Sequence, residues 1–293
     1  MGITKTPLRY PGGKQRLTPF IIEILGENGL LGGHYVEPYA GGAGAALELL
    51  FQKQVSSIHL NDSSRAIYAF WYSVLNHTEE LCRRVISASL TVEEWRRQQL
   101  IVKNPQRQNI LDLGFSTLYL NRVNRSGILS GGLIGGINQN GNYKMDARFT
   151  RSDIVRKIQM IASRRKDIKV TNMDAVKCLK HFGGGFPEHT LIYFDPPYFV
   201  NGSDLYLNFY LPDNHRQLAT VIQSIRGVKW ILSYDAAAEI LDLYDNRRQF
   251  VYNLQYHAAN RYKGREVFIF SDDTHLPKQS CLPYINESLV EMA

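Results

Sequence analysis

The chain has 293 residues, which is enough for one large domain or two modest ones with cores of their own. It carries 34 Lys and Arg against 27 Asp and Glu, and the resulting net charge of +7 favours an anionic partner. Cys82, Cys178 and Cys281 lie far apart, with no Cys-x-x-Cys pair. Their spacing argues against a disulfide framework and a structural zinc site, and it predicts an intracellular protein. No apolar run approaches the roughly 20 residues that cross a bilayer, so no membrane partner is expected.

Short β-rich runs alternate with amphipathic helical patterns along most of the chain, which is typical of a mostly parallel sheet covered by helices. Strands are predicted at 34–38, 57–61, 168–171, 190–194, 229–233, 251–255 and 267–271. Helices are predicted at 43–53 and 152–166, where apolar residues recur every three or four positions. We therefore expect an α/β fold with a Rossmann-like, mixed but mostly parallel sheet and helices on both faces.

The alternation stops between residues 67 and 149. Helical patterns at 66–75, 78–88, 92–100 and 111–121 are followed by a stretch rich in glycine and amide residues. Within it, Asn140-Gly141 between two short runs predicts a β-hairpin. We interpret 67–149 as an inserted, mainly helical target-recognition domain that carries this hairpin. Residues 1–66 and 150–293 would then form the cofactor-binding, catalytic domain.

A glycine-rich turn follows the first predicted strand and opens a helix; its residues include Glu37, Pro38, Gly41, Gly42 and Gly44. Glycines let the backbone approach a ligand, and the amides at the helix N-terminus point into the crevice beyond the strand. Glu37 would repel a pyrophosphate, whereas Asp62 lies where a carboxylate can take ribose hydroxyls. A helix N-cap is the alternative for Asp62. Together, Glu37 and Asp62 suit a nucleoside ligand without phosphates, such as S-adenosyl-L-methionine, better than they suit NAD.

A second motif, Asp195-Pro196-Pro197-Tyr198, follows an apolar strand. The prolines fix the backbone and remove two donors, so Asp195 and the Pro196 carbonyl can accept both hydrogens of an exocyclic amine. Tyr198 can stack on the ring that bears the amine. This arrangement turns the nitrogen lone pair toward a sulfonium methyl, and in-line transfer then needs no metal. A strand-terminal turn with a core tyrosine is the structural alternative.

The sequence resembles the Dam-type, adenine-specific DNA methyltransferases. Four stretches carry the resemblance: Leu-Arg-Tyr-Pro-Gly-Gly-Lys at 8–14, the turn from Glu37 to Gly44, Asn61-Asp62, and Asp195 to Tyr198. Their order, with an insert before the catalytic tetrapeptide, is also that of the family. The resemblance extends to about residue 271.

The resemblance implies a site-specific DNA adenine-N6 methyltransferase that extrudes its target base and releases S-adenosyl-L-homocysteine. It implies that Glu37, Pro38 and the glycines hold the methionine part of the cofactor, and that Asp62 takes the ribose. The other implied cofactor contacts are Tyr10, Gly13, Lys14, Asp174 and Asp195. It also implies double-stranded DNA as partner, a monomer in catalysis, a prokaryotic or phage-encoded cytoplasmic enzyme, and a role in restriction-modification beside a cognate endonuclease.

The insert is rich in side chains that can read DNA. Asn and Gln can read adenine through its N6 and N7, while Arg suits guanine or phosphate. Residues 143–169 hold six more basic than acidic residues, which indicates either a phosphate-binding surface or a solvated helix face. Each group of candidate residues also has a structural alternative: ordinary turn chemistry for Asn138, a place in the core for Tyr119 and a solvated hairpin for the basic turn around Lys263. The predicted DNA contacts are Tyr119, which would insert into the base stack, and Asn121, Arg122, Asn124, Arg125, Asn138, Gln139, Lys144, Arg148 and Lys263.

The residues exclude or disfavour two other classes of enzyme. A cytosine-C5 methyltransferase needs a cysteine nucleophile after a proline, but the three cysteines follow Leu, Lys and Ser, which excludes that class. A nicotinamide dehydrogenase is disfavoured by Glu37. A methyltransferase acting on an RNA base or a protein amine remains an alternative, as does a DNA-binding regulator that has lost catalysis.

Overall fold

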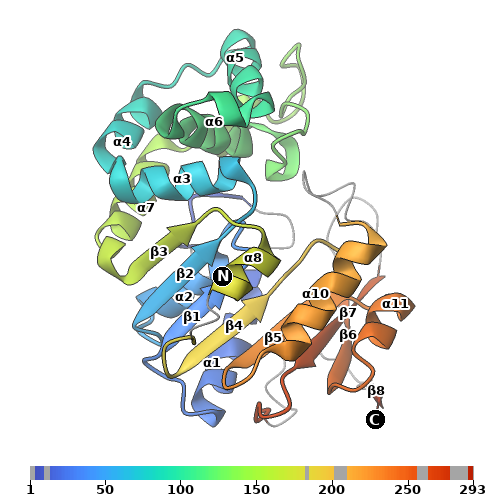
Figure 1. Ribbon diagram of the computed structural model, residues 1–293. Coiled ribbons are helices and arrows are strands. Elements are labelled where there is room, and N and C mark those ends of the chain that lie inside the picture. The colour runs from blue at the N-terminus through green and yellow to red at the C-terminus, as the bar shows by residue number, and fades with distance from the viewer. Residues whose placement is uncertain are drawn as a thin grey trace.

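The computed structural model describes residues 4–9, 14–181, 185–200, 210–255, 263–277 and 290–292. Within these ranges eight strands form one sheet, in the order β3-β2-β1-β4-β5-β7-β6-β8 (Figure 1). All seven predicted strands are present, with ends shifted by up to four residues. The strands are β1 (His34–Glu37), β2 (Ser57–Asn61), β3 (Ile168–Thr171), β4 (Thr190–Phe194), β5 (Lys229–Asp235), β6 (Gln249–Gln255), β7 (Lys263–Phe270) and β8 (Val290–Met292).

The first five strands are parallel, and β7 runs antiparallel to both β5 and β6. Strand β8 pairs antiparallel with β6. The chain goes from β1 outward to β2 and β3 and then returns to place β4 on the other side of β1. Ligands of open α/β sheets bind at such a reversal, outside the carboxyl ends of the strands. The topology therefore places a ligand crevice beyond β1 and β4.

Helices cover both faces of the sheet because its central strands are apolar on both sides (Figure 1). Tyr35 and Tyr193 enter one core, whereas their neighbours Val36 and Phe194 enter the opposite one. The first core is covered by α1 (Thr18–Glu27) and α2 (Gly44–Phe51). The second is covered by α8 (Ala175–His181), α10 (Pro212–Ser224) and α11 (Ala238–Leu243). The predicted α/β class is confirmed.

The region between β2 and β3 is helical, as expected. Helix α7 packs against α3 and α4, although the sequence assigned it to the catalytic part. Helices α3 and α6 cross closely at Gly114, where an added Cβ would lie 2.6 Å from the Ala69 carbonyl oxygen. The division into two domains stays a prediction. The helices are α3 (Arg65–Asn76), α4 (Thr78–Ser87), α5 (Val92–Lys103), α6 (Ile110–Val123) and α7 (Arg151–Ala162).

The hairpin predicted at Asn140-Gly141 does not form. Residues 124–150, all of them described, contain turns, short 3-10 segments and one isolated bridge between Asn124 and Leu133. The reason is Gln139, whose amide nitrogen donates to two loop carbonyls and whose amide oxygen accepts from the Met145 N–H. These hydrogen bonds, together with a φ of 49° at Gln139, hold the segment in turns instead of extended strands.

No helix in the described part of the chain is long and apolar enough to cross a membrane.

Candidate active site

The sheet brings the acids of the two sequence motifs to the same edge. Glu37 is the last residue of β1, and Asp195 follows the last residue of β4. The two strands are adjacent and parallel, with Val36 opposite Ile192. Residues about 160 positions apart in sequence thus meet at the point where the strand order reverses.

The glycine turn between β1 and α2 is held by side chains from two other elements. The Gly41 N–H donates to Asp62 Oδ2 at 2.9 Å, and the Gly41 carbonyl accepts from Trp71 Nε1 of α3, also at 2.9 Å. Gly41 has a φ of 45°, in the left-handed region that favours glycine, and Ala43 adopts a φ of 47° just before α2. Gly42 is buried and Gly44 begins the helix. The turn is therefore fixed before any ligand arrives.

Asn61 ties together the loops that follow β1, β2 and β3. Its Nδ2 donates to the carbonyls of Pro38 and Met173, each at 3.0 Å. Its Oδ1 accepts from the Thr171 hydroxyl and from the Met173 N–H. The side chain is fully buried, so these four hydrogen bonds satisfy it completely. The sequence indicated Asn61 only as part of a motif. Its hydrogen bonds to three different loops become visible only in the folded structure.

The two acids expected to contact the nucleoside have different local roles. Asp62 accepts N–H groups from Gly41 and Ser64, while the N-cap of α3 is Ser64 itself. The helix-cap alternative therefore does not describe Asp62. Asp174 does cap a helix, because its Oδ1 accepts the N–H groups of Val176 and Lys177 at the start of α8.

Glu37 is a buried carboxyl group with an unusual pKa. The side chain accepts the Ala46 N–H of α2 at 3.2 Å, and the residue is 5% exposed. Burial raises the pKa of Glu37 to about 8; the negative charge of Asp195 adds to this rise, and the Ala46 N–H opposes it. The group is thus poised to lose its proton when a cation binds beside it.

The catalytic tetrapeptide lies against Lys14 and β5. Oδ1 of Asp195 accepts the Ser233 hydroxyl at 3.1 Å and lies 3.3 Å from Nζ of Lys14. Burial raises the pKa of Asp195, with Lys14 opposing and Glu266 adding to the rise. Burial would lower the pKa of Lys14, but Asp195 and Glu266 together hold it well above its ordinary value. The two neighbouring carboxyl groups therefore stabilise the ammonium form of Lys14.

Glu266 is the residue of this site that sequence reasoning missed. It lies in β7 and is 2% exposed. Its carboxylate accepts the hydroxyls of Tyr198 and Tyr252 and lies 3.4 Å from Nζ of Lys14. The available signal was that Glu266 directly precedes the apolar run from Val267 to Phe270. A carboxylate so close to a buried strand needs partners, because acidic side chains are rarely buried without them.

Several predicted DNA contacts lie in the interior of the insert. Tyr119 is fully buried and its hydroxyl donates to the Ser89 carbonyl, which favours the core-tyrosine alternative. Asn124 accepts from Trp95 Nε1 and donates to two loop carbonyls. Gln139 is used in the same way within its loop. In this arrangement these polar groups are satisfied internally and are not presented to a duplex.

Asn121 and Arg122 hold the N-terminal segment against α6. Asn121 accepts the Arg9 N–H and donates to the Arg9 carbonyl, both at 2.7 Å. Arg122 donates to the Pro7 carbonyl at 3.2 Å. Burial, together with the positive charges of Arg9 and Arg148, lowers the pKa of Arg122 to about 10. Three arginines thus lie within electrostatic range of one another beside this segment.

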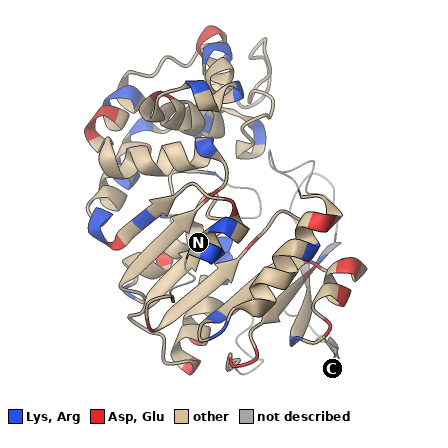
Figure 2. Ribbon diagram, in the orientation of Figure 1, with Lys and Arg blue, Asp and Glu red and all other residues tan. Residues whose placement is uncertain are grey.

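The remaining predicted contacts are exposed or lie beyond the described structure. Arg125, Asn138, Lys144 and Arg148 are exposed on the loop after α6. Figure 2 shows Lys and Arg on the helical insert and also on α8, a helix that packs on one face of the sheet. Tyr10 and Gly13 lie outside the described residues, as does Cys281, and Lys263 begins β7 without a described side chain.

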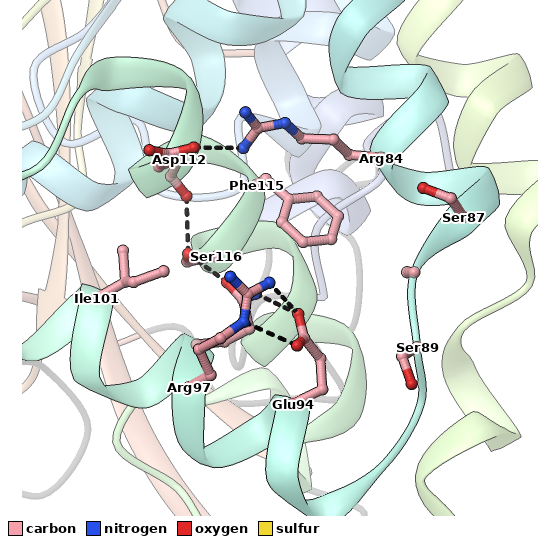
Figure 3. Close-up of a pocket in the computed structure, with 11 residues that line it drawn as sticks. Arg84, Ser87, Ser89, Glu94, Arg97, Ile101, Asp112, Phe115 and Ser116 are labelled. Carbon is pink, nitrogen blue, oxygen red and sulfur yellow. Dashed lines mark hydrogen bonds and ion pairs between the residues drawn. The ribbon is translucent and has the colours of Figure 1, made fainter.

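A polar pocket of about 410 Å³ lies within the insert, between α4, α5 and α6 (Figure 3). Its charges are paired, Arg84 with Asp112 and Arg97 with Glu94. None of the motif residues lines it, so it is separate from the site at the sheet edge.

The described residues contain no group of three or more His, Cys, Asp and Glu that could hold a metal ion.

A mostly parallel sheet with an acid at the end of β1, a glycine turn opening α2 and a second acid after β2 is the arrangement of a Rossmann-like, nucleoside-binding fold. The family model of the D12 class N6 adenine-specific DNA methyltransferases matches residues 10–261, and the chain belongs to this family. It is thus an S-adenosylmethionine-dependent methyltransferase that acts on adenine in DNA. The function predicted from the sequence is confirmed.

Two solved structures are similar to the chain at low identity. The rRNA methyltransferase aviRa from Streptomyces viridochromogenes is 10% identical with a TM-score of 0.35, and the match covers 89% of this chain and 86% of that one. Protein LPL1258 from Legionella pneumophila is 11% identical with a TM-score of 0.30, and the match covers 86% and 84%. No curated protein matches the chain.

Proposed function

We propose that Asp195 and the Pro196 carbonyl hold the N6 amine of an adenine extruded from duplex DNA, while Tyr198 stacks on its ring. The observation that carries this proposal is the position of Asp195 beside the carboxyl end of β1, next to the cofactor turn. Pro196 and Pro197 keep the tetrapeptide in one conformation. The target base and the cofactor would then meet at one strand reversal.

The contacts of Asp195 suit this role. The described residues reach its side chain only through Oδ1, by way of Ser233 and Lys14. We therefore assign Oδ2 to one hydrogen of the amine and the Pro196 carbonyl to the other. Holding both hydrogens orients the nitrogen lone pair toward the methyl donor. A methyl donor bound beside the amine would supply the carbon of the new N6–C bond, and the proton that N6 then loses would pass to solvent by way of Asp195 Oδ2, which accepts that hydrogen.

The residues at the other end of the crevice fit the cofactor. S-adenosylmethionine supplies, when bound, a methyl group on a positively charged sulfur. Glu37 offers a buried carboxyl group whose raised pKa suits an ammonium partner, and Asp62 offers carboxylate oxygens near the turn for ribose hydroxyls. Lys14 and Asp174 lie on the segments that flank this crevice. We propose that these residues, with Pro38 and the glycines, hold the cofactor.

On the DNA side, we propose that the loop after α6 contacts the duplex. The loop is pinned from inside by Gln139 and exposes Arg125, Asn138, Lys144 and Arg148. Tyr143, which the sequence did not single out, is 70% exposed beside Lys144. An exposed aromatic ring next to a basic side chain suits stacking on a base with a phosphate close by. We further propose a monomer acting inside a prokaryotic or phage-infected cell, paired with a cognate restriction endonuclease.

The test is to sequence DNA by a single-molecule method from cells that express the wild-type chain or the Asp195→Ala variant. We expect N6-methyladenine at one short sequence motif with the wild type only, because Asp195 orients the amine. Unmodified DNA in both cultures would contradict the DNA assignment and would favour an RNA substrate or a binding protein without catalysis.

Replacing Tyr143 by alanine is expected to weaken DNA binding roughly five- to a hundredfold, because stacking on a base contributes about 1–3 kcal/mol. Cofactor affinity should stay unchanged. Binding to a labelled duplex, measured by fluorescence anisotropy, checks this. Leu31→Ala is the control, since Leu31 is 53% exposed just before the amino end of β1, at the opposite edge of the sheet. Equal affinity of Tyr143→Ala and wild type would remove Tyr143 from the DNA surface.

A further inference from the structure

Glu266 lies at the centre of a buried network that joins three other parts of the fold. Lys14 comes from the short helix Lys14–Leu17, Tyr198 follows β4, and Tyr252 lies on β6. Tyr252 is directly opposite Glu266 in the β6–β7 register, so both side chains project from the same face of the sheet. The Tyr252 ring stacks on Phe268 with centroids 4.7 Å apart, which fixes the hydroxyl that donates to Glu266.

The network restrains Tyr198 from both ends. Its hydroxyl donates to Glu266 Oε1 and accepts from Nζ of Lys14 at 3.3 Å. The backbone that follows is held by the Asp235 carboxylate, which accepts the N–H groups of Phe199 and Val200 at 2.8 and 2.9 Å. A tyrosine ring turns about two torsions, and anchoring both the hydroxyl and the adjoining backbone leaves it little freedom. The plane offered to a base is thus set before the base arrives.

Glu266 also divides the ammonium group of Lys14 between two carboxylates. Nζ lies 3.3 Å from Asp195 Oδ1 and 3.4 Å from each oxygen of Glu266. Without the charge on Glu266, the ammonium would be drawn toward Asp195 alone. The ammonium group would then compete with the N6 amine of adenine for the Asp195 oxygens, which must accept a hydrogen of that amine. The Glu266 carboxylate therefore keeps Asp195 available.

We propose that Glu266 is a positioning residue for methyl transfer: it orients the Tyr198 ring and holds the Lys14 ammonium between itself and Asp195. The assignment rests on the proposed roles of Asp195 and Tyr198. Glu266 acts through these two side chains and does not itself touch the substrate.

The test compares Glu266→Gln with wild type, using a duplex that contains the methylated motif. Glutamine keeps the size of the side chain but loses the charge and presents an N–H group toward other donors. We expect the single-turnover rate at saturating DNA and cofactor to fall about ten- to a hundredfold, the loss of a charge-assisted hydrogen bond. The dissociation constants of DNA and cofactor should change less than about threefold. Glu239→Gln, the same change on exposed α11, should match wild type.

A spectroscopic measurement separates positioning from a general loss of structure. With 2-aminopurine in place of the target adenine, stacking on Tyr198 quenches the fluorescence of the extruded base. The Glu266→Gln complex should be brighter than the wild-type complex at saturating protein. Tyr198→Phe keeps the ring but removes the hydroxyl, so it should brighten the probe too, and the two changes together should be less than additive.

The possible outcomes are distinct. If wild type transfers no labelled methyl group to DNA adenine, the proposed function fails. If wild type is active but Glu266→Gln and Tyr198→Phe match it in rate and fluorescence, the proposed function stands and the role of Glu266 is overturned. If Glu266→Gln does not fold, Tyr198→Phe alone decides, and wild-type rate and fluorescence in that variant overturn the proposal.

Discussion

Replacing Asp195 by alanine is expected to lower the single-turnover rate of methyl transfer at least about a thousandfold. The N6 amine of adenine is a weak nucleophile because its lone pair is delocalised into the ring. Without the Asp195 carboxylate, one of its hydrogens loses its acceptor and the lone pair is no longer oriented. Transfer of a labelled methyl group to a duplex, measured with enzyme in excess, checks this.

Cofactor affinity should be spared in the same variant. We expect the dissociation constant of S-adenosylmethionine, measured by calorimetry, to stay within about tenfold of wild type, because Asp195 acts mainly on the amine. Asp273→Asn is a matched control, since Asp273 pairs with Lys229 at the amino end of β5, away from the crevice. Wild-type turnover in Asp195→Ala would contradict the assigned role of the tetrapeptide.

Cofactor affinity is expected to rise with pH, by about tenfold per unit between pH 6 and pH 7, because the Glu37 carboxyl must lose its proton to pair with an ammonium group. Burial raises the pKa of Glu37 to about 8, so the group is mostly neutral at pH 6. The rise should level off near pH 8, where an ordinary α-amino group itself begins to deprotonate. Calorimetry in buffers of different ionisation enthalpy should also detect proton release on binding.

The Glu37→Gln variant should bind the cofactor about ten- to a hundredfold more weakly at pH 8 and should lose most of this pH dependence. It should also unfold at a higher temperature than wild type at pH 8 without cofactor. A carboxyl group whose pKa is raised by folding destabilises the folded state increasingly as the pH rises from its unfolded value to its folded one, and glutamine removes that cost. Glu27→Gln, at the exposed end of α1, is the control. An unchanged pH profile in Glu37→Gln would exclude Glu37 as the titrating group.

The placement of the two motifs at one edge of the sheet could be predicted because each motif is local. Glu37 ends one apolar strand and Asp195 directly follows another, and adjacent parallel strands present their carboxyl ends at one edge, so the two acids had to meet. The DNA side could not be predicted in the same way. Asn121, Asn124 and Gln139 have the side chains expected of base readers, but the structure uses them on backbone groups of the insert and of the N-terminal segment.

The sequence by itself therefore determined the α/β class, the helices between β2 and β3 and the meeting of the two motifs at one sheet edge, because strand burial and turn composition act over a few neighbouring residues. Only the tertiary structure decided which polar side chains face inward. Glu266 meets Lys14 across 252 positions and Asn121 meets Arg9 across 112, so no local pattern reports either contact. The sequence does not distinguish a polar residue on the surface from one in the core. Its burial depends on hydrogen-bond partners that only the folded chain brings together.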